Sequence, residues 1–326
     1  MTSLTLTARG GLRQMADGVA RLIPVKERIL EAAAQWPPHR RSRGSYRCFS
    51  ALARRTNTRR AAVSGNLGIS AALKCELPST HLIALYGLPE FYAGERGALE
   101  LAARLSRFAT AFVDIGAHIG YFTIFVHQRG APNVPIYFFE PDPTLYAALA
   151  RNVRVNGLAR IHGHDRAVGA TDGVARFFVN DTDSLSGSLH AEFAAGHQIT
   201  ATEVTVERFE TIAQRLELRG ACVKVDVEGA EYAFLEGAGD SLDGVDYLIM
   251  EVLGDACARG FVSAMMRRGR FHAYYINDYS LEHSLDGSFT YRAPEYNWLF
   301  CRETPDELRQ KIGQSALSVR AEASPR

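Results

Sequence analysis

The sequence predicts an α/β protein whose core is a doubly wound, mostly parallel β-sheet. Apolar runs of four to six residues alternate with segments of helical periodicity, as expected for strands that are covered on both faces and joined by helices. A glycine-containing turn follows the first of these core strands. Carboxylates end several of the runs, and in a parallel sheet such ends share one edge.

The elements follow in chain order. A helix is expected over residues 25–35, where Pro37 and Pro38 end it, and two short strands over residues 69–77 and 81–86. Later strands, each a short apolar or alternating run, are expected over residues 111–115, 136–139, 161–168, 174–180, 202–206, 222–227, 247–252, 271–276 and 298–302. Later helices are expected over residues 98–108, 121–127, 144–156, 231–237, 256–268 and 305–313.

Composition places the chain among ordinary globular proteins. Its 326 residues are 47% hydrophobic and 22% charged, which excludes disorder throughout. No run of about 18 apolar residues occurs, so we expect no transmembrane segment. Five widely spaced cysteines form no CxxC pair, which favours a reduced, cytoplasmic protein.

The chain is expected to divide into three parts. Residues 1–66 are a basic extension, helical or partly disordered, whose first 60 residues hold 13 Lys and Arg but 3 Asp and Glu. Residues 67–313 are the α/β domain, which begins with a short hairpin, and residues 314–326 are a flexible tail. A basic run can bind nucleic acid or a membrane surface, but no aromatic residues alternate with these arginines. We therefore interpret the run as a solvated arm, and we expect no secretory signal in it.

The turn after the first core strand is the most informative stretch. It reads Asp114-Ile115-Gly116-Ala117-His118-Ile119-Gly120-Tyr121. Glycine there lets the backbone turn tightly and lets a ligand approach the main chain. The spacing is not the G-x-G-x-x-G of pyrophosphate sites, and the acid before the turn would repel a phosphate. That acid suits a cationic group such as an ammonium.

A second acid, Glu140, follows the next strand and precedes Pro141. In doubly wound sheets an acid at this place accepts hydrogen bonds from the hydroxyls of a ribose. Alternatively Glu140 caps the following helix, although Asp142 is better placed for capping. An ammonium, a ribose and no phosphate together fit S-adenosylmethionine. Its adenine would lie near Asp165, Arg166 and Ala167 after the third strand, where Asp165 can accept from the exocyclic amine, although a polar surface loop explains Asp165 nearly as well.

Three acids stand within six residues at the end of a later core strand: Asp226, Glu228 and Glu231. Negative charges so close repel one another unless a cationic group lies beside them, and Lys224 on the same strand can neutralise part of this negative charge. Asp226 or Glu228 could act as general base for a substrate hydroxyl, and Glu251 at the end of the next strand is a further candidate. The alternative is a salt-bridged strand end. We expect no metal ion, because no Asn or His accompanies the carboxylates at suitable spacing.

These motifs resemble the FkbM-type S-adenosylmethionine-dependent methyltransferases. The similar segments are Val113-Asp114-Ile115-Gly116-Ala117-His118-Ile119-Gly120, Phe139-Glu140-Pro141 and the most specific, Val223-Lys224-Val225-Asp226-Val227-Glu228-Gly229-Ala230-Glu231. A Ser/Gly loop over residues 184–189 and the segment Asn297-Trp298-Leu299-Phe300 are also similar in kind, and the resemblance covers residues 68–303. The family often has Asn where this chain has His118, whose charge would respond to pH.

The resemblance implies the class I methyltransferase fold, a Rossmann-like sheet of seven strands with the last one antiparallel. It also implies O-methylation of a hydroxyl on a sugar, glycolipid or secondary-metabolite acceptor by in-line methyl transfer. The candidate cofactor residues are Asp114, Gly116, Ala117, His118, Gly120, Tyr121, Glu140, Pro141, Asp165, Arg166, Ala167 and Asp226. The candidate catalytic residues are Asp226, Glu228, Glu251 and Lys224. The acceptor and the base stay open, and a homo-oligomer is compatible with the sequence.

Three other functions compete with this reading. A nucleic-acid methyltransferase could use the basic arm, but Asp226-Val227-Glu228 stands where base-amine methylating enzymes usually carry an Asn/Asp-Pro-Pro-aromatic segment. A non-catalytic cofactor-binding subunit is possible, although Asp114 and Glu140 are intact. A nicotinamide dehydrogenase would need the absent G-x-G-x-x-G turn.

Overall fold

The computed structural model describes residues 62–66, 72–76, 95–180, 187–189, 199–277, 280–288, 297–313 and 318–321. The chain separates into two compact units, Met1–Leu88 and Pro89–Arg326. In the first unit β1 (Ala62–Asn66) pairs antiparallel with β2 (Ala72–Glu76). The strand expected over residues 69–77 is seen as β2, and it pairs with an earlier segment of the chain. The helix expected over residues 25–35 and the strand over residues 81–86 lie outside the described residues.

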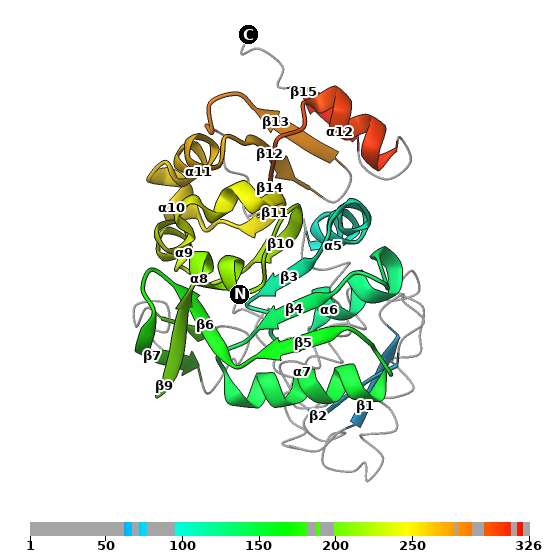
Figure 1. Ribbon diagram of the computed structural model, residues 1–326, viewed down its shortest axis with the longest axis vertical. Helices are drawn as coiled ribbons and strands as arrows, with labels where there is room; N and C mark the ends of the chain where they lie inside the picture. The colour runs from blue at the N-terminus through cyan, green and yellow to red at the C-terminus, as the bar shows by residue number, and fades with distance from the viewer. Residues whose placement is uncertain are drawn as a thin grey trace, which may run out of the picture. The chain divides into compact units, whose positions relative to one another are not determined.

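The second unit is built on a nine-stranded sheet of order β15-β13-β12-β14-β11-β10-β3-β4-β5 (Figure 1). Its strands are β3 (Phe112–Ile115), β4 (Ile136–Phe139), β5 (Ile161–His164), β10 (Ala221–Val225), β11 (Val245–Glu251), β12 (His272–Ile276), β13 (Ser280–Ser284), β14 (Asn297–Cys301) and β15 (Ser318–Ala321). Neighbours from β5 to β11 are all parallel, and β14 is antiparallel to both β11 and β12. This is the predicted mostly parallel α/β sheet with an antiparallel β14.

The sheet has nine strands and not the seven that the resemblance implies. β13 pairs antiparallel with β12, and β15 pairs parallel with β13. Neither strand is an apolar run: β13 reads Ser-Leu-Glu-His-Ser, and β15 lies in the segment expected to be a flexible tail. Their place in the sheet depends on long-range backbone pairing, which short polar segments do not reveal in the sequence.

Helices cover both faces of the large sheet. They are α5 (Glu95–Leu105), α6 (Tyr121–Phe125), α7 (Pro143–Val155), α8 (Phe209–Arg215), α9 (Glu231–Ala238), α10 (Gly254–Ala258), α11 (Phe261–Gly269) and α12 (Pro305–Ile312), with short 3-10 turns at Ser106–Phe108 and Gly239–Gly244 and a π turn at Val126–Gly130. α8 was not expected, and the helix expected over residues 256–268 is broken at Gly260, whose φ is +81°. None of the helices in the described ranges is long and apolar enough to cross a membrane.

The strand expected over residues 161–168 is divided between two sheets. β5 ends at His164, and β6 (Arg166–Gly169) begins a four-stranded sheet of order β6-β9-β7-β8. The other members are β7 (Gly173–Asn180), β8 (Gly187–Ser188) and β9 (Ile199–Arg208). This small sheet has its own core of Ala167, Phe177, Val204 and Val206. Residues 184–186 of the predicted Ser/Gly loop lie outside the described residues, and its Gly187 and Ser188 form β8.

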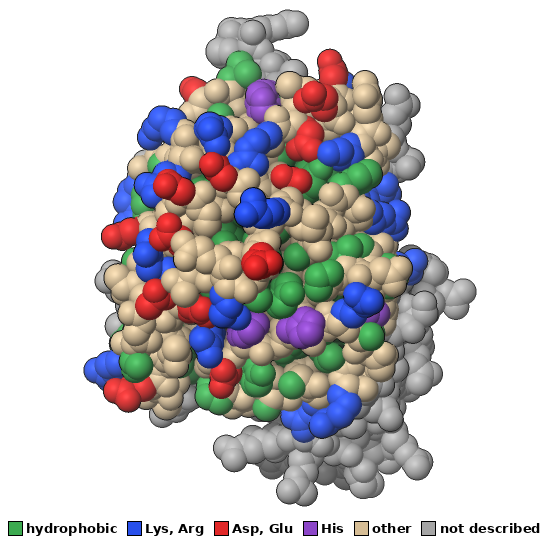
Figure 2. Space-filling view, viewed as in Figure 1, with side chains coloured by type: hydrophobic (Ala, Val, Ile, Leu, Met, Phe, Trp, Pro, Cys, Tyr) green, Lys and Arg blue, Asp and Glu red, His purple; other side chains and the backbone are tan. Residues whose placement is uncertain are grey.

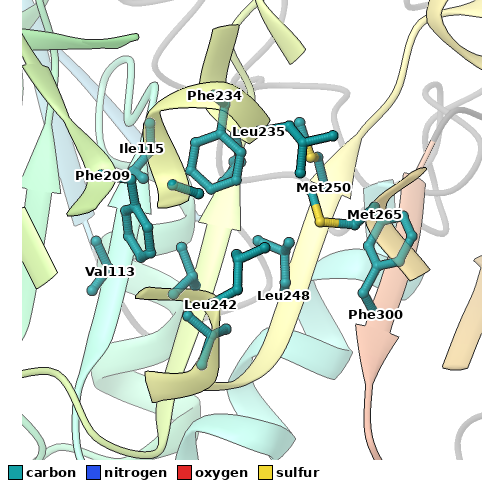
Figure 3. Packing of buried hydrophobic residues seen from close by; sticks show 14 of the residues in the cluster. Val113, Ile115, Phe209, Phe234, Leu235, Leu242, Leu248, Met250, Met265 and Phe300 are labelled. Carbon is teal, nitrogen blue, oxygen red and sulfur yellow. The ribbon is translucent and has the colours of Figure 1, made fainter. Parts of the chain in front are cut away.

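The main core lies between the sheet and the helices α8, α9 and α11 (Figure 3). Alternate residues of the central strands, such as Val113 and Ile115 on β3, face these helices. Phe209 of α8 and Phe234 of α9 are fully buried, and their ring centroids lie 5.3 Å apart. Leu149 of α7 packs with Phe138 in a separate cluster. Because both faces of the sheet are buried, the register of each strand is fixed, and so are the residues that lie at its carboxyl end.

Phe234→Ala is expected to lower the free energy of unfolding by about 3–5 kcal/mol, because it leaves a cavity beneath two helices. Val174→Ala is the control, since Val174 is 70% exposed, and it should change the value by less than about 0.5 kcal/mol. Urea unfolding followed by circular dichroism measures both. A loss below about 1 kcal/mol for Phe234→Ala would contradict the packing described above.

Candidate functional site

Four predicted site residues come from four strands to one edge of the large sheet. Asp114 is on β3, Glu140 follows β4, Asp226 follows β10 and Glu251 ends β11. These strands are parallel, so their carboxyl ends point the same way. The backbone N–H of Asp226 donates to the carbonyl of Ile115 at 3.0 Å, which places the turn after β10 directly beside the turn after β3.

The glycine turn, residues 116–120, needs glycine at both ends. Gly116 has φ +70° and Gly120 has φ +89°. A Cβ on Gly116 would overlap the carbonyl oxygen of Asp226, and one on Gly120 would press on Leu149. The N–H groups of Gly116 and Ala117 both donate to the carbonyl of Phe139, at 3.0 and 3.1 Å. The turn is thus packed closely between the ends of β4 and β10, and glycine is needed there because a side chain would overlap its neighbours.

Asp114 is completely buried beneath this turn. Its Oδ2 accepts hydrogen bonds from the backbone N–H and the hydroxyl of Thr123, at 3.0 and 2.7 Å. Its Oδ1 lies 3.8 Å from Nζ of Lys224 and has no hydrogen bond within the described part of the chain. Burial raises the pKa of Asp114, while Lys224 and Thr123 act against that rise. Thr123 was not among the predicted residues, because its role depends on how α6 packs and not on a motif.

Lys224 connects the turns after β3 and β10. Its Nζ donates to the carbonyl of Gly116 at 3.0 Å and to Oδ2 of Asp226 at 3.2 Å. It also lies 5.1 Å from the ring centroid of Phe122. Lys224 stands opposite Asp114 in the β3–β10 register, so the expected neutralisation of the acids is seen, and it extends to Asp114 as well as Asp226.

Glu140 is 4% exposed and does not cap the following helix. Asp142 is the cap of α7 and accepts from the N–H groups of Thr144 and Leu145 at 2.7 and 3.1 Å. Glu140 instead accepts from the N–H of His118 at 2.7 Å and from the N–H of Asp142 at 2.9 Å. His118 therefore contacts Glu140 through its backbone, in a left-handed conformation with φ +53°.

The acidic loop, residues 226–231, is held from two sides. Glu228 has φ +46°, and its carbonyl accepts a hydrogen bond from the hydroxyl of Ser188 at 2.7 Å. Glu231 is 1% exposed, and its Oε1 accepts from the N–H of Leu253, two residues beyond Glu251, at 3.0 Å. Neither Ser188 nor Glu231 was predicted to have this positioning role. The Ser/Gly composition of the loop was a signal for Ser188, whereas the partner of Glu231 is visible only in the structure.

The three residues proposed for adenine are not grouped. Asp165 is exposed between β5 and β6. Arg166 pairs with Glu207 at 3.3 Å, and Ala167 is buried in the core of the small sheet. Tyr121 and Pro141 are buried beside the glycine turn and Glu140. Within the described ranges no group of three His, Cys, Asp or Glu side chains is arranged to hold a metal ion.

Burial raises the pKa of Glu140 to about 8. The unfolded chain releases this proton near the ordinary value of 4.5, whereas the folded chain keeps it until about pH 8. The unfolded state therefore binds fewer protons between these values, and the free energy of unfolding should fall as pH rises through this window, by at most roughly 1.4 kcal/mol per pH unit from this group.

Glu140→Gln should remove the part of the pH dependence of the free energy of unfolding that comes from Glu140. The measurement is urea unfolding from pH 5 to 8 for both proteins. Asp114 stays in both, so its own raised pKa cancels in the difference between them. Parallel curves for wild type and variant would show that Glu140 does not hold a proton in this range.

Comparison with known proteins agrees with these motifs. A family model described as the methyltransferase FkbM domain matches residues 114–281. Methyltransferase 1 of Beauveria bassiana is 26% identical over 158 residues, covering 43% of this chain and 63% of that protein. The 31-O-demethyl-FK506 methyltransferase FkbM of Streptomyces tacrolimicus is 31% identical over 183 residues, covering 47% of this chain and 69% of that protein. The match thus spans slightly less than two thirds of the length of the first relative and slightly more than two thirds of the length of the second.

Solved structures of low sequence identity also match. A precorrin-6y C5,15-methyltransferase from Geobacter metallireducens is 10% identical, with coverage of 64% of this chain and 87% of that chain and a TM-score of 0.36. TrmK of M. capricolum, in complex with S-adenosyl-homocysteine, is 14% identical, with coverage of 62% and 65% and a TM-score of 0.34. The family model covers slightly more than half of the sequence, including the glycine turn and the acidic loop. This chain belongs to the FkbM family of S-adenosylmethionine-dependent methyltransferases.

Proposed function

We propose that this methyltransferase acts on a hydroxyl group of a small-molecule or glycan acceptor, such as a sugar, a glycolipid or a secondary metabolite. The observation that carries the proposal is the set of carboxylates at the carboxyl ends of two neighbouring parallel strands: Asp226 and Glu228 follow β10, and Glu251 ends β11. A hydroxyl must lose its proton when it is methylated, and a carboxylate beside it can take that proton. One relative's printed name describes methylation at an oxygen, which agrees with this class of reaction.

The residues at the sheet edge fit the cofactor. The glycine turn has no Cβ at Gly116, where the backbone of Asp226 approaches closely, and we assign this turn to the methionine end of the cofactor. Glu140 places a buried carboxylate at the end of β4, where a ribose would donate hydrogen bonds to it. Asp165 is the exposed acid after β5 and is the residue we assign to the adenine amine. Arg166 and Ala167 contribute to the small sheet, and we assign them no direct contact.

The cofactor supplies a methyl group on a positively charged sulfur, so the chain has to orient the acceptor and remove one proton. Asp226 is our first assignment for the base, because its side chain is 28% exposed and is oriented by Lys224. Glu251 is the second, since it ends the neighbouring strand and is partly exposed. Glu228 lies in the strained part of the acidic loop, with its backbone held by Ser188.

The charge distribution supports a small acceptor over a nucleic acid. On the face that Figure 2 shows, acidic and basic side chains are interspersed among the described residues. Such mixing gives that face no single-sign field of the kind that attracts a polyanion. The basic arm of residues 1–60 lies outside the described residues, and we assign it no acceptor contact.

Calorimetric titration with S-adenosylhomocysteine tests the cofactor site. Wild type should bind, and Glu140→Ala should bind about 10–100-fold more weakly, because removing one partner of a buried hydrogen bond costs about 1–3 kcal/mol. Glu236→Ala is the control, since Glu236 is exposed on α9. Equal affinity of all three proteins would show that Glu140 does not hold the ribose.

Asp226→Asn should lower turnover by about 100-fold or more and change the affinity for S-adenosylhomocysteine far less, because loss of a general base affects the chemical step. Transfer of labelled methyl to a panel of hydroxylated acceptors measures turnover. Asp240→Asn, at an exposed residue, is the control. Full turnover in Asp226→Asn together with loss in Glu251→Gln would assign the base to Glu251, and full turnover in both would exclude the two residues.

A further inference from the structure

A cation already stands at the glycine turn. In the described part of the chain, the oxygens near Nζ of Lys224 include the Gly116 carbonyl at 3.0 Å, Oδ2 of Asp226 at 3.2 Å and Oδ1 of Asp114 at 3.8 Å. Its side chain is 8% exposed. Residues at the ends of β3 and β10 thus form one site for an ammonium group, and the ammonium group of Lys224 occupies it.

One of these oxygens belongs to Asp114, the acid that the sequence pattern assigns to the ammonium group of a ligand. Asp114 is fully buried, and Thr123 occupies its Oδ2. The oxygen that remains, Oδ1, is the one beside Lys224. A ligand's amine that binds this oxygen would lie close to Nζ of Lys224, which is 3.8 Å from it.

A second ammonium cannot share this position. Two like charges that approach the same oxygens repel strongly where water is largely excluded. The ring of Phe122, 5.1 Å from Nζ, provides a further contact that favours a cation at this point. The resident cation is therefore stabilised from several sides.

We propose that Lys224 takes the place of the cofactor's α-amino group at the glycine turn, so that this methyltransferase binds its cofactor without recognising that amine. The inference rests on the proposed cofactor site. Lys224 is then a specificity-determining residue and not the base. Its removal opens the three oxygens to the ligand's own ammonium.

The test compares two ligands by calorimetry: S-adenosylhomocysteine and the analogue in which hydrogen replaces its α-amino group. Wild type should bind the two with similar affinity. In Lys224→Met the ratio of the two affinities should shift toward S-adenosylhomocysteine by about tenfold or more, since tenfold corresponds to about 1.4 kcal/mol, within the range of a charged hydrogen bond.

Two further variants keep the test decisive. Lys224→Met leaves Asp114 buried without its partner, so the double variant Asp114→Asn/Lys224→Met is measured as well, with thermal unfolding to confirm that each protein is folded. Lys311→Met is the matched control. Lys311 pairs with Glu303 and contacts Tyr247 near the start of β11, away from the site edge.

The outcomes separate the two proposals. An affinity ratio that is the same in wild type and in the folded Lys224 variants overturns the assignment of Lys224. Absence of any S-adenosylhomocysteine binding by folded wild type overturns the proposed cofactor site, and the Lys224 assignment with it. A shift in the ratio for the Lys224 variants but not for Lys311→Met supports the assignment.

Discussion

The ion pair between Asp114 and Lys224 is the constraint around which the site is arranged. The two residues stand opposite each other on the neighbouring parallel strands β3 and β10, both almost without solvent contact. Neither charge could be buried alone, since an unpaired charge in such a place typically costs about 3–5 kcal/mol. The same lysine contacts Gly116 and Asp226, so the turn after β3 and the loop after β10 have one common support.

Glu140 and Asp142 show how a short sequence distributes two carboxylates between two roles. Asp142 caps α7 and satisfies the N–H groups of Thr144 and Leu145. Glu140, two residues earlier, is then not needed at the helix and lies buried beside the glycine turn. It accepts backbone hydrogen bonds there without a cation in direct contact among the described residues, which is why burial dominates its titration.

The parts of the fold that the sequence predicts are those in which local pattern and tertiary role agree. β3, β4, β10 and β11 are mostly apolar runs with an acid at or beside the carboxyl end, and the glycine turn needs glycine for steric reasons at Gly116 and Gly120. β13 and β15 escape prediction because their residues are polar and their pairing is non-local. The contacts made by Thr123, Ser188 and Glu231 escape prediction for a related reason: each is a single hydrogen-bonded contact between segments 9, 40 and 22 residues apart, and no spacing rule marks it.

The hydrogen bond from Ser188 to Glu228 couples the small sheet to the candidate site. It joins the small sheet to the acidic loop through a side-chain hydroxyl and a backbone carbonyl, and so it does not depend on the residue type at position 228. A change of length between β7 and β9 that keeps Ser188 in place would keep this hydrogen bond, and with it one of the two anchors of the acidic loop.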